Sequence, residues 1–181
     1  MRTVPLVKWM QCALLAALTG VFTWLSIPID PVPINLATLA VFLAGGLLGA
    51  KYGAISQIIY LLLGVAGIPV FSKMRSGAGV LLGPTGGYIV GYIVAAWLVG
   101  LLAQRFGRKL KVLVPAMAAG AVCYYLLGTL WYIYSTGSGV LPALMMCVLP
   151  FLPGDAAKVA VAATLVRRLA PVLEKETAPI A

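Results

Sequence analysis

The segment Pro150-Phe-Leu-Pro-Gly-Asp155-Ala-Ala-Lys158 decides how this chain folds, because it places a carboxylate and an ammonium group inside a long apolar run. The run extends from Val140 to Leu169 and contains no other charged residue before Arg167. A membrane-spanning helix needs roughly 20 predominantly apolar residues, so this run is long enough to cross a bilayer. The segment therefore predicts a transmembrane helix that carries two charged side chains at depth.

The composition of the whole chain also indicates a protein that lies in a lipid bilayer. Of its 181 residues, 62% are apolar and only 9% are charged, whereas a soluble domain carries about 25% charged residues. At roughly 20 residues a span, this length holds about six or seven spans and no soluble catalytic domain. The net charge of +9 comes mainly from basic residues that lie between apolar runs. This distribution indicates membrane topology rather than nucleic-acid binding.

We expect six spans within a single transmembrane domain that covers residues 1–181. The second and third spans are short and rich in glycine, which predicts helices that are tilted, broken or tightly packed. A polar, glycine-rich stretch at 68–87 is the longest connection between spans. The spans are expected at about 6–27, 34–50, 52–67, 88–104, 112–134 and 140–169.

The distribution of basic residues predicts the orientation. With six spans, both termini lie on one side of the membrane, and ten Lys and Arg residues fall on that side. The opposite side receives only Lys73 and Arg75. Because Lys and Arg accumulate on the cytoplasmic side, we expect cytoplasmic N- and C-termini. The predicted fold class is an all-α, multi-pass protein of the cell membrane, with loop 68–87 facing outward.

Asp155 and Lys158 are the strongest candidates for a functional site. An ionised side chain at membrane depth costs at least about 2.5–3.5 kcal/mol and commonly marks a ligand or ion pathway. A spacing of three residues puts both groups on one helix face. The distance from Asp155 to Arg167 along a helix is about 18 Å, which places the pair near the membrane centre. Pro153 and Gly154 predict a helix break just before the pair. The alternatives are a structural pair or two side chains that reach an interface.

The remaining sequence patterns mainly exclude metal sites and catalytic motifs. The chain has no histidine, and Cys12, Cys123 and Cys147 form no Cys-x-x-Cys pair, so we expect no metal site. Walker, HExxH and Ser/His/Asp patterns are also missing from the sequence, so we expect neither a cofactor nor enzyme activity. Ala13 and Ala17 belong to a small-residue stripe that favours close helix approach, either within the protein or to a partner.

Four segments together resemble the BioY family, the substrate-binding S components of biotin transporters of the energy-coupling factor (ECF) type. The segments around Tyr88 and Asp155 are the specific part, and the resemblance extends from the first span to Leu169. It implies a six-helix fold with an outward-facing biotin pocket that loop 68–87 caps. The segments are Pro31-Val-Pro33, Leu43-Ala-Gly-Gly-Leu-Leu-Gly49 with Lys51-Tyr-Gly53, Leu82-Gly-Pro-Thr-Gly-Gly-Tyr88 and Phe151-Leu-Pro-Gly-Asp-Ala-Ala-Lys158.

The resemblance also implies the roles of particular residues. It implies that biotin is bound by Asp155, Lys158, Tyr88, Gly87, Gly86, Ser76 and Gly77, and we add Arg75 and Asn35 as further candidates for the same site. It implies that Ala13 and Ala17 meet a transmembrane coupling protein (the T component), which is itself bound to two ATP-binding subunits. If the protein works alone, a homo-oligomer is the alternative assembly.

Some positions depart from the family. Members often carry Gly-Gly where this chain has Lys73 and Met74, and a small or amide residue where it has Arg75. This departure leads to the hypothesis that Arg75 or Lys73 meets the ligand carboxylate. We further expect Asp155 to accept a ureido N–H, and Lys158 to orient Asp155 and donate to a ligand oxygen. The alternatives are an S component for another vitamin, such as thiamin or riboflavin, and a structural membrane protein.

Overall fold

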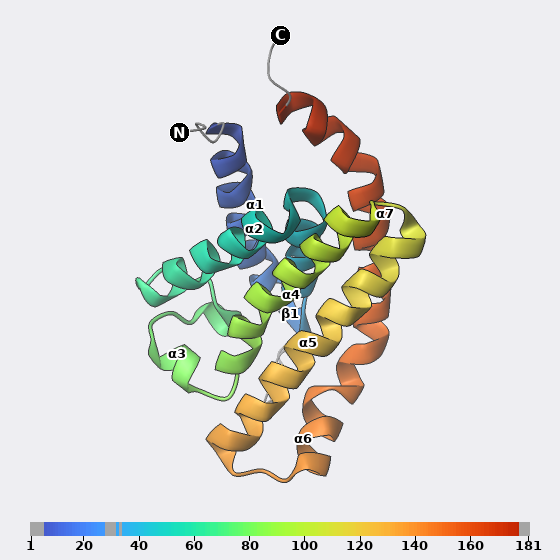
Figure 1. Cartoon of the computed structure of the whole chain (residues 1–181). Coiled ribbons are helices and arrows are strands. Elements are labelled where there is room, and N and C mark those ends of the chain that lie inside the picture. Colours follow the sequence, from blue (N-terminus) through green and yellow to red (C-terminus); the bar gives the residue numbers. More distant parts are fainter. Residues whose placement is uncertain (1–5, 28–31, 33, 178–181) are drawn as a thin grey trace.

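The computed structural model describes residues 6–27, 32 and 34–177, and it is almost entirely helical (Figure 1). Five segments are long and apolar enough to cross a membrane by length and composition, as predicted for an all-α integral membrane protein. The elements are α1 (Leu6–Trp24), β1 (Ser26–Ile27), β2 (Ile34–Asn35), α2 (Ala37–Val65), η1 (Ser72–Met74), α3 (Gly79–Leu82), α4 (Gly86–Phe106), α5 (Leu110–Thr136), α6 (Val140–Cys147), η2 (Leu149–Phe151) and α7 (Leu152–Thr177).

Helix α2 covers both the second and the third expected spans. It is a single element with a sharp turn at Gly49, where the chain reverses its direction. The backbone of Gly49 has φ 81° and ψ −178°, a conformation that favours glycine. A Cβ added at Gly53 would lie 2.9 Å from the Cα of Gly45, whereas residues eight apart in a straight helix are about 12 Å apart. The two limbs, 37–48 and 50–65, therefore form a helical hairpin.

Helix α4 and the α4–α5 connection stabilise this turn. Arg108 donates from Nε to the carbonyl of Gly46 (2.8 Å) and from Nη2 to the carbonyl of Leu47 (3.1 Å). The Gln104 side-chain oxygen accepts the backbone N–H of Ala50 at 3.1 Å. Gly100 lets α4 approach closely, since a Cβ there would lie 2.3 Å from the Ala50 nitrogen. Backbone groups freed by the reversal thus find partners inside the protein, as a low-dielectric surrounding requires.

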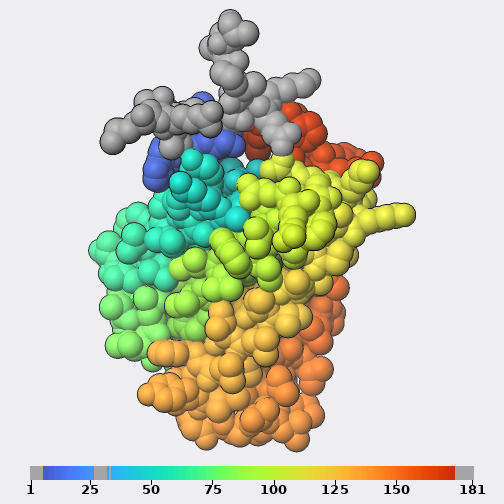
Figure 2. Space-filling view, viewed as in Figure 1, coloured from blue at the N-terminus to red at the C-terminus, as the bar shows by residue number. Residues whose placement is uncertain are grey.

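The core lies around α4, which packs against both α2 and α5 (Figure 1). Ala95, Ala96 and Val99 of α4 are fully buried. Helix α1 packs against α2, and α7 packs against α2 and α5. The space-filling view shows the face seen in Figure 1 covered by side chains of α2, α4 and α5 (Figure 2).

The last apolar run is interrupted earlier than the sequence suggested. The expected break at Pro153 and Gly154 lies instead at Val148–Phe151, where α6 ends and the short η2 turn leads into α7. Pro153 falls in the first turn of α7, where a missing N–H costs no intrahelical hydrogen bond. Asp155 consequently sits in the first turn of α7 and not at its first residue.

The connection between α2 and α4 is a loop with two short helical turns, η1 and α3. A bridge between Phe71 and Arg75 closes it into a tight loop, and Phe71 is buried against Gly64. Lys73 and Met74 both have positive φ values, 59° and 54°. The start of α1 and the end of α7 lie together at the opposite end of the molecule from the α5–α6 turn (Figure 1).

Candidate functional site

A cavity of about 570 Å³ lies between the helices and the α2–α4 loop. Its volume is within the range of about 300–1,000 Å³ that is typical of small-molecule sites. Its lining comes from α1, the β2–α2 junction, the second limb of α2, the α2–α4 loop, α4, α5, the end of α6, η2 and α7. The lining residues are Thr23, Val32, Asn35, Thr38, Tyr60, Phe71, Ser72, Lys73, Arg75, Ser76, Gly79, Val80, Gly83, Pro84, Thr85, Tyr88, Ile89, Tyr92, Tyr124, Tyr125, Cys147, Phe151, Asp155 and Lys158.

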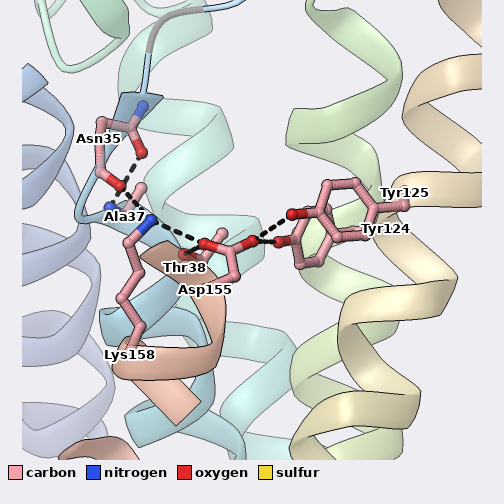
Figure 3. A network of polar contacts seen from close by, with 7 residues as sticks. All are labelled: Asn35, Ala37, Thr38, Tyr124, Tyr125, Asp155 and Lys158. Atoms are coloured by element: carbon pink, nitrogen blue, oxygen red, sulfur yellow. Dashed lines mark hydrogen bonds and ion pairs between the residues drawn. The ribbon is translucent and has the colours of Figure 1, made fainter. Parts of the chain in front are cut away.

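The Asp155 carboxylate is the centre of a polar network at the wall of this cavity (Figure 3). Its Oδ1 forms an ion pair with the Lys158 ammonium at 2.7 Å and accepts the Thr38 hydroxyl at 3.3 Å. Its Oδ2 accepts the Tyr125 hydroxyl at 2.6 Å and the Tyr124 hydroxyl. The network therefore joins α2, α5 and α7 around one carboxylate.

Lys158 links this network to the β2–α2 junction. Its Nζ donates to the backbone carbonyl of Asn35 at 2.6 Å as well as to Asp155. The Asn35 side chain accepts the N–H of Ala37 at 3.0 Å and donates to the Ser72 hydroxyl in the loop at 3.1 Å. The buried pair is thus connected through Asn35 to the segment that covers the cavity.

The hydrogen-bonding capacity of the pair is almost fully used. A carboxylate has about four acceptor positions, and Asp155 accepts from four side chains. An ammonium has three donors, and Lys158 gives two of them to described residues. Asp155 is 4% and Lys158 is 8% exposed. Removal of either partner would leave a buried charge without its counter-ion, which is costly.

Aromatic rings form the apolar wall of the cavity. Tyr92 meets Tyr124 edge-on, with ring centroids 6.0 Å apart. The Tyr88 ring packs directly on Gly128. A Cβ added at Gly128 would lie 2.3 Å from Cδ1 of the ring. The Tyr88 hydroxyl donates to the carbonyl of Cys147 at the end of α6. This wall suits a flat, apolar ring system, with polar groups only at defined points.

Six of the nine predicted ligand-binding residues line the cavity, and three do not. The six are Asp155, Lys158, Tyr88, Ser76, Arg75 and Asn35. Gly86 and Gly87 instead allow close packing. A Cβ added at Gly86 would lie 1.7 Å from the carbonyl oxygen of Leu81, and one added at Gly87 would lie 2.3 Å from the Cβ of Trp131. Gly77 has a φ of 90° and donates its N–H to the Gly64 carbonyl at 2.7 Å, so it shapes the loop.

Three residues of the network were missed by the sequence analysis. Thr38, Tyr124 and Tyr125 carry no charge and lie in apolar segments, so nothing in the pattern distinguishes them from packing residues. The adjacent pair Tyr124-Tyr125 within an apolar span was the available signal, since buried tyrosine hydroxyls need hydrogen-bond partners.

The two small residues predicted to meet a partner lie on the outside of α1. Ala13 and Ala17 are exposed, whereas Ala16 and Gly20 of the same stripe are buried. Gly20 allows close contact with Val70, which a Cβ would approach to 3.2 Å. Among the described residues, no group of three or more His, Cys, Asp or Glu side chains is arranged to hold a metal ion.

Comparison with known proteins gives consistent matches along most of the chain. Residues 1–175 match the BioY family. The "Biotin transporter BioY" of Thermotoga maritima is 37% identical over 162 residues, which cover 88% of this chain and 93% of that protein. The "Probable biotin transporter BioY" of Pyrococcus horikoshii is 40% identical over 158 residues, which cover 87% and 92%.

A solved structure agrees in fold as well as in sequence. The S-component for biotin from an ECF-type ABC transporter, known from a crystal structure, matches with a TM-score of 0.85 and 30% identity. The match covers 93% of each chain. The extent of these matches leads to one assignment: this multi-pass membrane protein belongs to the BioY family.

Proposed function

We propose that this protein is the S component of an ECF transporter and that it binds biotin in the cavity around Asp155 and Lys158. The observation that carries the proposal is the buried, almost saturated ion-pair network at the wall of a 570 Å³ cavity. Charged residues at membrane depth commonly mark substrate sites. The proteins that match this chain are named biotin transporters or a biotin S component, which supplies the ligand.

The network suggests how the ureido ring is bound. Because both Asp155 oxygens already accept two hydrogen bonds each, Asp155 acts as a positioning group and a ureido N–H meets a tyrosine hydroxyl oxygen instead. Tyr124 and Tyr125 donate to the carboxylate, so their oxygen lone pairs face other donors. The remaining N–H of Lys158 donates to the ureido carbonyl. This revises the hypothesis that Asp155 accepts a ureido N–H directly.

The carboxylate tail of biotin is placed at the loop wall of the cavity. Arg75 is exposed and lines the cavity from the loop, with Ser76 beside it. A guanidinium matches carboxylate geometry through two parallel hydrogen bonds. The ring system then lies against the tyrosine wall, and the charged tail lies nearest to the solvent. Such an orientation keeps the ionised group out of the apolar interior.

The surface of the bundle supports a proposed assembly and orientation. The protein binds and delivers a ligand and catalyses no reaction, so a T component and two ATP-binding subunits supply the energy. Ala13 and Ala17 on the exposed face of α1 form the surface that meets the T component. Arg108 and Arg167 line one shallow pocket between the end of α4, the α4–α5 connection and α7, and this basic side is cytoplasmic by the distribution of charge.

The test is equilibrium binding of radiolabelled biotin to the purified protein in detergent. Asp155→Asn and Lys158→Ala should each weaken binding by about tenfold or more, which corresponds to about 1.4 kcal/mol. Tyr134→Phe is the matched control, because this tyrosine of α5 is 82% exposed and should bind like the wild type. A wild-type protein that binds thiamin or riboflavin in preference to biotin, or variants with unchanged affinity, would refute the proposal.

A further inference from the structure

A second, shallow pocket lies on the basic side of the bundle, where the α4–α5 connection passes beside α7 (Figure 1). Its volume is about 490 Å³, and none of its lining residues belongs to the cavity around Asp155. Gln104, Gly107 and Arg108 line it from α4 and the connection, and Arg167, Ala170 and Pro171 line it from α7. The connection and α7 therefore each bring one arginine to the same concavity.

The two arginines differ in how they are held. Arg108 donates from Nε to the Gly46 carbonyl and from Nη2 to the Leu47 carbonyl, so its guanidinium is fixed at the wall of the pocket. It keeps its positive charge there, because an arginine side chain is not deprotonated in proteins. Arg167 is exposed, and its guanidinium has no hydrogen bond or ion pair with any described residue. Its fork of N–H donors can therefore bind a ligand.

The surroundings of the pocket are strongly basic. The stretches 101–115 and 160–177 together contain seven basic and two acidic residues, and both acids, Glu174 and Glu176, follow the part of α7 that lines the pocket. No side chain caps the start of α5 at Lys109, so the first backbone N–H groups of this helix add positive partial charge. Because a guanidinium binds phosphate oxygens through two parallel hydrogen bonds, a phosphate group matches this pocket.

Exposed apolar side chains adjoin the basic ones and indicate where the phosphate comes from. Phe106 lies at the end of α4, and Leu169 and Val172 lie on α7, each next to a residue that lines the pocket. All three side chains are exposed. A free anion gains nothing from contact with apolar surface, whereas a phospholipid joins its phosphate to acyl chains. Basic pockets between transmembrane helices on the cytoplasmic side bind lipid headgroups of this kind.

We propose that the pocket binds the headgroup of an anionic phospholipid, with Arg167 donating to the phosphate and Arg108 as a fixed positive charge beside it. The last carbonyls of α4 have no donors within the helix, and the hydroxyls of a phosphatidylglycerol headgroup supply such donors. The bound lipid links α7 to the α4–α5 connection, which holds the turn at Gly49 through Arg108. Occupation of the pocket thus stabilises the fold, and this effect is independent of the proposed binding of biotin.

General attraction of basic residues to a negatively charged membrane surface is the alternative, and it predicts a different pattern. Such attraction acts alike on every Lys or Arg near the surface, whereas a built pocket depends on the arginine that lines it. Arg167 and Arg168 are adjacent and both exposed, and only Arg167 lines the pocket. The two residues therefore form a matched pair for mutation.

Thermal unfolding of the purified protein in an uncharged detergent tests the ligand. Phosphatidylglycerol titrated to tenfold above its Kd should raise Tm by about 3–6 °C for a protein of this size. Phosphatidylcholine with the same acyl chains has no net charge and should raise Tm much less. Glycerol 3-phosphate supplies the phosphate without acyl chains and should leave Tm nearly unchanged. An equal shift with phosphatidylcholine would overturn the anionic headgroup, and an equal shift with glycerol 3-phosphate would overturn the lipid.

The matched pair of arginines tests the site. Arg167→Gln should weaken phosphatidylglycerol binding by about tenfold, whereas Arg168→Gln should bind like the wild type. Arg167→Lys keeps the charge but loses the planar fork, so it should lie between the two. Native mass spectrometry counts the lipids retained by each folded variant, which separates lost binding from lost folding. Equal binding by the two glutamine variants, whether retained or lost, would overturn the pocket as a site.

Discussion

The Asp155–Lys158 pair makes a quantitative prediction for a double-mutant cycle. Asp155→Asn keeps the size of the side chain but replaces one acceptor oxygen with an NH2 group, which cannot accept. Two of its four donors then lose their partner, and the Lys158 ammonium keeps only the Asn35 carbonyl. Lys158→Met removes the cation, while Asp155 retains donors on Thr38 and the two tyrosines. The two single changes are therefore unequal in their effect.

The magnitudes follow from burial and from the bonds that remain. Breaking a buried ion pair from one side costs about 3–5 kcal/mol, and Asp155→Asn should cost the full amount. Lys158→Met should cost roughly 2–3 kcal/mol, because charge-assisted hydrogen bonds still stabilise the carboxylate. The double variant leaves no buried charge, so its cost should stay at about 3–5 kcal/mol, well below the sum. The coupling is then about 2–3 kcal/mol.

Thermal unfolding in detergent is the assay. For a protein of this size, 1 kcal/mol corresponds to about 2–4 °C in Tm, so Asp155→Asn should lower Tm by roughly 6–20 °C. The double variant should unfold at nearly the same temperature as Asp155→Asn alone. Additive losses in the double variant would refute the reasoning, because they would mean that the two charges do not compensate each other.

Three further changes test the surroundings of the pair. Tyr125→Phe should weaken biotin binding by about tenfold and lower Tm, because it removes a 2.6 Å hydrogen bond to a buried carboxylate. Gly128→Ala should cost about 1–3 kcal/mol of stability and also weaken binding, since its Cβ would lie 2.3 Å from the Tyr88 ring. Met74→Gly should raise Tm by about 2 °C, because its φ of 54° is strained for a residue with a Cβ.

Each of these changes has a control within the chain. Tyr134→Phe removes a hydroxyl from an exposed tyrosine of the same helix and should leave both binding and Tm unchanged. Gly154→Ala meets no atom within 4 Å and should be tolerated, in contrast to Gly128→Ala. Met74→Ala should not raise Tm, and an increase equal to that of Met74→Gly would contradict the argument from backbone strain.

The sequence was informative where a charged residue lies in a segment expected to be buried in the membrane. Asp155 and Lys158 could be identified because charges are rare in apolar runs, and the structure shows that they form a buried ion pair. Tyr124 and Tyr125 gave a weaker signal, because an adjacent pair of tyrosines in a membrane helix shows only that two hydroxyls need partners and not which group they meet. Their role depends on the rotation of α5 relative to α7, which is set by packing between helices and not by the local sequence.

Glycines show the same limit in a different form. Gly86 and Gly87 were expected at the ligand because they belong to a segment that resembles the family. Their surroundings show instead that they permit close packing against Leu81 and Trp131. A glycine in the sequence indicates close approach or an unusual φ value, but it does not indicate what approaches. The boundary between the second and third expected spans, at 50–52, implied a reversal of the chain, and the structure has it at Gly49 within one continuous helical element.

The reversal at Gly49 has a consequence for the order in which the protein assembles. The first limb of α2, about 18 Å long at 1.5 Å per residue, is too short to cross a hydrocarbon core of about 30 Å. The turn that follows it depends on Gln104 and Arg108 for its backbone hydrogen bonds. Gln104 lies 54 positions after Ala50, and Arg108 lies 62 positions after Gly46. Both residues are therefore synthesised after the turn that they stabilise. A nascent chain that stops before them therefore holds an incomplete hairpin, and the fold closes only when the α4–α5 connection reaches the turn.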